Sequence, residues 1–278
     1  MKKLSFAAVA VAAHALFPVL LAAQATTPTP AAPAAPAAPA PSTSTATAGE
    51  PAVSPLIQAL GDSIPPDVAQ KVGVLLEEAQ KARKENRYTG ALSKLEEAEK
   101  LAPKVSLIYT MRGDVYLAPR RRDFDLAKEQ FLKSLELDST SPGPRFNLAE
   151  LEFARHDFPV AAAAFRKLIT DFPKLPMTIR HLSLFRIVIC EARMKNYDVA
   201  EKIIKDSFTF MDDSPAYYLS GAAVSFAKKD LKMANEWMLR AAGIFKEPQL
   251  GPYLDAFREM RWIKDVDWEA LPDPSAGK

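Results

Sequence analysis

One spacing recurs through most of this 278-residue chain and constrains its fold more than any other feature. An aromatic residue or a leucine stands three residues before an alanine, and a large apolar residue follows that alanine by four. The five copies begin at Tyr88, Phe124, Phe158, Tyr197 and Leu231, and their alanines are Ala91, Ala127, Ala161, Ala200 and Ala234. Steps of three and four residues place side chains on one face of an α-helix. The pattern therefore predicts the same helix five times.

A partner helix is expected before each copy, because apolar residues at helical spacing precede it, beginning with Val68 and Val72. In four of the five turns an Asp or Asn lies where it can cap the second helix. The expected pairs are a helix ending before Asn86 with 89–101, 106–118 with 126–137, 144–154 with 159–170, 179–194 with 198–210, and 215–227 with 232–245. A final helix is expected at 252–262.

The repeat has a characteristic length. The spacings from alanine to alanine are 36, 34, 39 and 34 residues, and a period near 34 with two helices per unit resembles the tetratricopeptide repeat (TPR). Small residues such as Ala79 and Gly113 and the prolines Pro103 and Pro173 stand where the TPR pattern has them, whereas its tryptophan is absent. The resemblance covers residues 68–247. It implies an all-α fold, a right-handed superhelical solenoid of about five helix-turn-helix hairpins with a C-terminal capping helix.

The two ends of the chain differ from its middle. Two lysines, an apolar run and Ala23-Gln24-Ala25 predict a signal peptide over 1–25, cleaved after Ala25, and a periplasmic or secreted protein. An uncleaved membrane anchor is the alternative for this run. Residues 26–55 are rich in Ala, Pro and Thr and predict a disordered linker. The expected remainder is a lead-in segment at 56–67, a cap at 248–271 and a tail at 272–278.

The residue types required for catalysis or metal binding are scarce. No phosphate-binding or hydrolase motif is present, and His156 and His181 have no partner at ligand spacing. We therefore expect no enzyme, no catalytic residue, no metal and no cofactor. Removal of Lys2 and Lys3 lowers Lys+Arg from 36 to 34, equal to the 34 Asp+Glu, which argues against nucleic acid as a partner. Stable membrane insertion is not expected after signal removal.

The TPR resemblance implies a concave groove, lined by the first helix of each hairpin, that binds a peptide or helical segment of another protein. Counting from the alanines predicts the groove residues Gln80, Arg83, Asp114, Leu117, Phe146, Glu150, Phe153, Phe185 and Phe226. Phe185 and Phe226 either line the groove or fill core between hairpins, because an error of one residue rotates a helix position by about 100°.

These features predict a non-catalytic protein–protein interaction scaffold or adaptor of the bacterial cell envelope. The alternative is a self-associating structural component of an envelope assembly, and the sequence leaves the oligomeric state open. The basic turn Arg120-Arg121-Arg122 has two interpretations as well. It either docks an acidic partner or anionic polymer, or it is an ordinary solvated turn.

Overall fold

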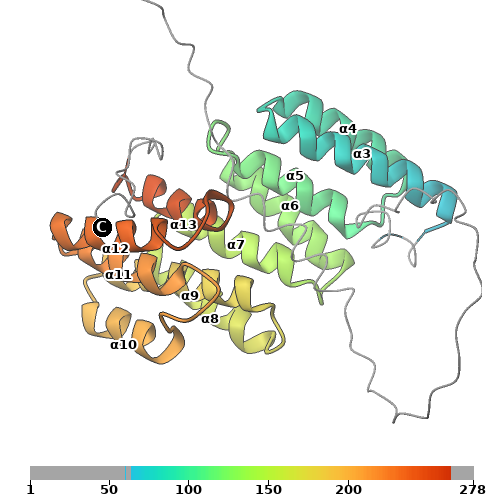
Figure 1. The fold of residues 1–278 in the computed structure, drawn as a ribbon. Coiled ribbons are helices and arrows are strands. Elements are labelled where there is room, and N and C mark those ends of the chain that lie inside the picture. Colours follow the sequence, from blue (N-terminus) through green and yellow to red (C-terminus); the bar gives the residue numbers. More distant parts are fainter. Residues whose placement is uncertain (1–59, 61–63, 264–278) are drawn as a thin grey trace, which may run out of the picture.

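The computed structural model describes Leu60 and residues 64–263, and this part of the chain is all-helical, with 11 helices and no strand (Figure 1). The predicted signal peptide, linker and tail, most of the lead-in and the end of the cap lie outside the described residues. The helices are α3 (Pro66–Lys84), α4 (Tyr88–Leu101), α5 (Ser106–Leu117), α6 (Phe124–Leu137), α7 (Pro142–Ala154), α8 (Phe158–Asp171), α9 (Met177–Arg193), α10 (Tyr197–Ser207), α11 (Ala216–Ala227), α12 (Leu231–Ala242) and α13 (Glu247–Glu259).

The order of contacts between helices follows the order of the sequence. Helices α3 to α12 pack in pairs as five hairpins, numbered 1 to 5 from α3–α4 to α11–α12. Each second helix also contacts the first helix of the next hairpin, and consecutive first helices contact one another. The last helix, α13, packs on α11 and α12 and also reaches back to α9. Hairpins that are neighbours in sequence are therefore neighbours in space (Figure 1).

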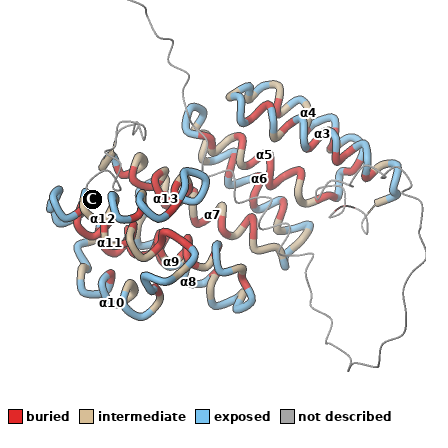
Figure 2. The backbone as a smooth tube through the Cα atoms, viewed as in Figure 1, coloured by how far each residue is buried: buried red, intermediate tan, exposed pale blue. Residues whose placement is uncertain are grey.

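The repeated alanines are the points of closest packing. All five are fully buried, at 0% exposure, and the buried stripe on each helix faces its neighbours (Figure 2). Gly113 shows why small residues are needed: a Cβ atom there would lie 2.4 Å from the ring of Phe131, which is itself fully buried. Since real Cβ contacts never come this close, helices α5 and α6 approach at this distance only because residue 113 has no side chain.

Every turn between a first and a second helix is built alike. Each contains one non-glycine residue with φ between 45° and 65°, and the end of α13 repeats the conformation. These residues are Asn86, Arg122, His156, Lys195, Lys229 and Arg261. In hairpin 3, for example, the amide of His156 donates to the carbonyl of Phe153 and that of Asp157 to the carbonyl of Glu152, both at 3.0 Å. These bonds satisfy carbonyls that the helix end would leave free.

Aspartates cap the second helices of hairpins 2, 3 and 5. Their side chains accept hydrogen bonds from backbone amides three residues later, and the pairs are Asp123 with Leu126, Asp157 with Val160 and Asp230 with Met233. The capping predicted from sequence is confirmed at these turns. At Asn196 the side chain makes no such bond.

Three helices have a boundary that differs by three or more residues from the prediction. α10 ends at Ser207 rather than near Phe210, because Phe208 adopts an extended conformation that buries its ring. α12 ends at Ala242, just before Gly243. α13 begins at Glu247, five residues earlier than expected, and carries Pro252 inside it. Proline is disfavoured inside helices, so the sequence placed the start of this helix at Pro252 instead of before it.

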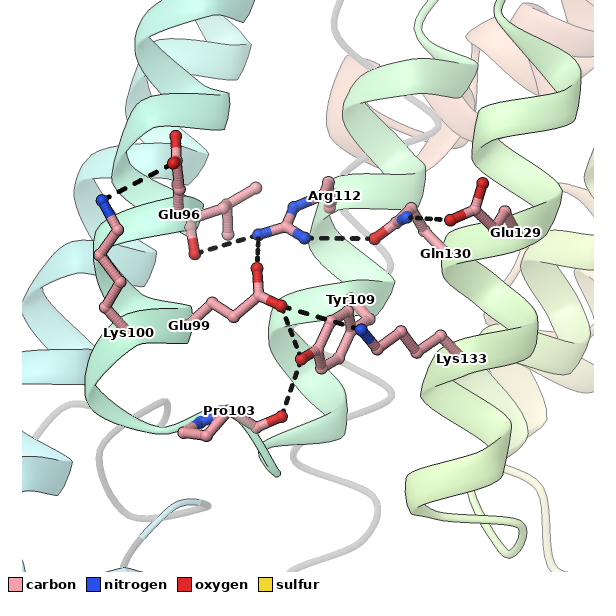
Figure 3. A network of polar contacts seen from close by, with 10 residues as sticks. Glu96, Glu99, Lys100, Pro103, Tyr109, Arg112, Glu129, Gln130 and Lys133 are labelled. Carbon is pink, nitrogen blue, oxygen red and sulfur yellow. Dashed lines mark hydrogen bonds and ion pairs between the residues drawn. The ribbon is translucent and has the colours of Figure 1, made fainter.

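A polar network fixes hairpin 1 on hairpin 2 (Figure 3). Glu99 of α4 accepts hydrogen bonds from the Tyr109 hydroxyl at 2.9 Å and from Arg112 Nη2 at 2.5 Å, both on α5. Lys133 of α6 lies 3.9 Å from the same carboxylate. Burial, followed by the bond to Glu99, raises the pKa of Tyr109 to about 12. Side chains of α5 and α6 therefore converge on the Glu99 carboxylate of α4 at this junction.

Candidate binding face

The nine residues predicted to line a groove all lie on first helices, and we call the side of these helices that carries them the first-helix face. The structure places Gln80 and Arg83 on α3, Asp114 and Leu117 on α5, Phe146, Glu150 and Phe153 on α7, Phe185 on α9 and Phe226 on α11. Their surroundings divide the face into two halves. The C-terminal half is covered by α13, and the N-terminal half is polar.

Helix α13 fills the C-terminal half with aromatic side chains. The ring of Phe185 lies 4.9 Å from that of Tyr253 and 5.7 Å from that of Phe257. Phe226 contacts Phe257 at 5.5 Å and stacks on Trp262 at 5.6 Å. Phe185 is 0% and Phe226 7% exposed, so both are core residues under α13.

Phe146 and Phe153 of α7 are also buried, at 3% and 2% exposure. Phe146 packs edge-on against Phe165, and Phe153 against Phe158, both on α8. Their rings therefore serve the packing inside hairpin 3. The sequence favoured these two phenylalanines as groove residues because they lie seven residues apart on one helix face, and a core stripe has the same spacing.

A buried ion pair joins α7, α9 and α13. Arg186 of α9 donates from Nε to Glu150 Oε1 at 2.7 Å and from Nη2 to Glu150 Oε2 at 3.2 Å, and Nη2 also donates to the carbonyl of Pro252 at 3.3 Å. Burial raises the pKa of Glu150, and Arg186 opposes this shift. Sequence reasoning missed Arg186, whose only signal was a charge within an otherwise apolar helix segment.

The far end of α13 reaches the turns of hairpins 2 and 3. Glu259 receives two hydrogen bonds from Arg122, at 2.9 Å to Oε1 and 2.5 Å to Oε2. Its Oε1 also lies 3.5 Å from Nε2 of His156. The turn that carries Arg122 is the one with two additional residues. One member of the basic triplet therefore pairs with a carboxylate of this chain, 137 positions away.

The N-terminal half of the face carries charge that is incompletely paired. Arg83 is 6% exposed, and its Nη1 atom has no hydrogen-bond partner within the described part of the chain. Asp114 accepts one hydrogen bond from Nδ2 of Asn147 at 2.7 Å. Burial raises the pKa of Asp114 to about 6, and the charge of Arg83 partly offsets this rise. Gln80 and Leu117, on the same two helices, are half-buried.

The described residues contain no group of three or more His, Cys, Asp or Glu side chains that could hold a metal ion. Cys190 is buried, and burial raises the pKa of its thiol. His181 Nδ1 lies 2.7 Å from the hydroxyl of Ser214, with both side chains inside the packing between α9 and the segment before α11. No helix between residues 64 and 263 is long and apolar enough to cross a bilayer.

A scan against protein-family models gives no match for this chain, and a search of curated proteins gives none either.

Proposed function

We propose that this chain is a non-catalytic protein-binding scaffold or adaptor of the cell envelope. In this proposal the five hairpins form a right-handed TPR-like solenoid with α13 as its cap, and the first-helix face takes a peptide or helical segment of another protein. Support comes from the repeat period near 34 residues combined with helix contacts that run from each hairpin to the next.

The contacts of α13 restrict where such a segment can bind. Displacing α13 would expose Tyr253, Leu254 and Phe257, all at most 3% exposed. Each large apolar side chain of this kind contributes about 1.5–3 kcal/mol when buried, so the C-terminal half is permanently occupied. The partner is therefore assigned to the N-terminal half, formed by α3, α5 and the exposed edge of α7.

The observation that carries this assignment is the buried Nη1 atom of Arg83, which has no hydrogen-bond partner among the described residues. A buried donor without an acceptor costs about 1–3 kcal/mol, and natural proteins retain few of them. Nη1 of Arg83 is buried in the free chain, so a ligand carbonyl or carboxylate would satisfy it only if binding opens the surface there, and a ligand N–H would then find the carboxylate of Asp114 on the neighbouring helix.

Site-specific photo-crosslinking in cells that export the protein tests the assignment. A benzophenone amino acid at Gln80 or Leu117 is expected to capture one partner, and Arg83→Met, which keeps the apolar stem, is expected to abolish the adduct. Matched probes at Glu129 and Glu136, exposed on α6, serve as controls. Equal capture at the control positions, or capture unaffected by Arg83→Met, would refute this binding face.

Self-association is the second candidate function, and one observation favours it. Leu239 of α12 and Ile244, two residues after the end of that helix, are 42% and 58% exposed. Apolar side chains at the end of a repeat stack can pair with another copy. Light scattering on the purified chain distinguishes the two functions, because a monodisperse monomer would exclude self-association as the main role.

A further inference from the structure

The turns of hairpins 2 to 5 stack on one another along a single edge of the molecule. At the end of the first helix in hairpins 3, 4 and 5, a cation lies over the aromatic ring that begins the second helix of the preceding hairpin. Arg155 lies 5.4 Å from the ring centre of Phe124, Arg193 lies 5.4 Å from that of Phe158, and Lys228 lies 5.2 Å from that of Tyr197. The same interaction at three successive junctions aligns the turns. We call these turns and the first residues of the helices that follow them the turn edge.

The turn edge carries cations that have no partner. Most of its acidic residues are engaged, since three aspartates cap helices and Asp125 and Glu201 pair with Arg155 and Lys228. Asp198, at the start of α10, is exposed and makes no ion pair or side-chain hydrogen bond to any residue between 64 and 263. Five exposed basic residues of this edge make no ion pair or side-chain hydrogen bond to any residue between 64 and 263: Arg120, Arg121, Lys195, Lys229 and Lys232. Arg261 makes none either, and it follows the end of α13 that Glu259 joins to the turns of hairpins 2 and 3. The free charge on this edge is therefore positive, although the chain as a whole is close to neutral.

Three of these cations occupy positions where a basic residue is conformationally unfavourable. Lys195, Lys229 and Arg261 have φ values of 65°, 63° and 57°. This region favours glycine or asparagine, and other residues are uncommon in it. A basic residue stands at each of these three positions despite the strain, which points to a role for the charge.

A row of exposed apolar side chains runs beside the cations. It occupies the same register in each second helix, directly before the buried alanine, and consists of Leu126, Val160, Val199 and Met233, which are 36% to 47% exposed. The N-termini of these helices face the same edge, and helix N-termini carry partial positive charge. The cations, the helix N-termini and the exposed apolar residues therefore all lie on the turn edge.

We propose that the turn edge binds an anionic lipid surface. The free cations take the phosphates of the headgroups, and the apolar row enters the boundary between headgroups and acyl chains, as in other peripheral proteins that combine basic and apolar residues. A purely polar polyanion would leave the apolar row without a role. This edge is separate from the first-helix face, so it would hold the scaffold against a membrane while that face stays available.

Vesicle cosedimentation of residues 26–278 tests the proposal. This form lacks the apolar run 4–23, which would itself enter lipid. The protein is expected to bind vesicles that contain phosphatidylglycerol and not vesicles of phosphatidylcholine alone. Each cation near an anionic bilayer contributes about fivefold in affinity, so the triple variant Arg120→Gln, Lys195→Gln, Lys229→Gln is expected to bind about a hundredfold more weakly.

A matched control variant distinguishes the effect of where the cations lie from the effect of lowering the net charge. The variant Lys104→Gln, Lys174→Gln, Lys205→Gln removes the same charge from exposed residues at the opposite edge and is expected to keep binding. Val160→Ser with Val199→Ser is expected to lose on the order of fivefold. Equal losses in both triple variants, or no dependence on phosphatidylglycerol, would overturn the proposal. Binding of poly-L-glutamate without binding of vesicles would assign the edge to an acidic polypeptide and overturn it too.

Discussion

Replacing Phe257 by alanine tests whether α13 is an integral cover of the first-helix face. Phe257 is 0% exposed, and its ring lies 5.5 to 5.7 Å from those of Phe185, Phe226 and Trp262. A buried Phe→Ala change costs about 3–5 kcal/mol. Three aromatic neighbours place this site near the upper end, because each ring pair adds about 0.5–1.5 kcal/mol beyond buried area. We expect Phe257→Ala to lower the free energy of unfolding by about 4–5 kcal/mol.

Urea unfolding followed by circular dichroism gives this magnitude, and hydrogen exchange shows where the loss occurs. Amides of α13 and of the facing helices α9 and α11 are expected to lose protection, whereas those of α3 to α6 keep it. Val199→Ala, at a residue 45% exposed on α10, is the control and should change stability by less than about 0.5 kcal/mol. A loss below about 1 kcal/mol for Phe257→Ala would refute the packing described here.

Three further predictions concern charge and close packing. The folded protein binds the proton of Asp114 more tightly than the unfolded chain does, since its pKa is raised from 3.8 to about 6. Stability should therefore fall by up to about 3 kcal/mol as pH rises from about 4 to 6, and Asp114→Asn should remove that dependence in unfolding curves. Gly113→Ala should destabilise by about 1–3 kcal/mol in urea, because its Cβ would strike Phe131. Arg122→Gln or Glu259→Gln should each cost about 1 kcal/mol, given their partial exposure, and exchanging the two charges should restore stability.

Each of these predictions has a control. If the free energy of unfolding of the Asp114→Asn variant keeps the same pH dependence as that of the wild type, the raised pKa of Asp114 would be contradicted. Gly90→Ala should stabilise α4 slightly, because a Cβ there meets only the end of an arginine side chain at 3.9 Å. Arg120→Gln removes a neighbouring charge that has no partner between residues 64 and 263 and should have no effect on stability. A loss equal to that of Arg122→Gln would show that the pair with Glu259 contributes nothing.

The helices could be predicted because their signals are local. The alanines, the apolar residues around them and the caps at Asp123, Asp157 and Asp230 act within one or two helical turns. The small residue at Gly113 was also visible from its place in the repeat. The predicted helix boundaries were wrong where packing against distant residues overrode the local signals. At Phe208, for example, burial of the ring ends α10 early.

The candidate site was less predictable, because core and groove positions share one helical period. Counting from the repeated alanines places Phe185 and Phe226 at groove positions. They are core residues only because α13 and the residues that follow it cover them. Arg83 and Asp114 of the polar half were predicted by counting positions from the repeated alanines. Arg186 was missed although its charge lies within an apolar helix segment, because its partner Glu150 is 36 residues away.

The sequence by itself determined five helical hairpins, their turns and the small residues between them, because these depend on side chains a few positions apart. The tertiary structure alone decided that α13 crosses the first-helix face, that Glu259 pairs with Arg122 and that the cations of successive turns share one edge. These outcomes depend on the rotation between successive hairpins, which accumulates over more than 100 residues. A local sequence pattern does not determine that total rotation.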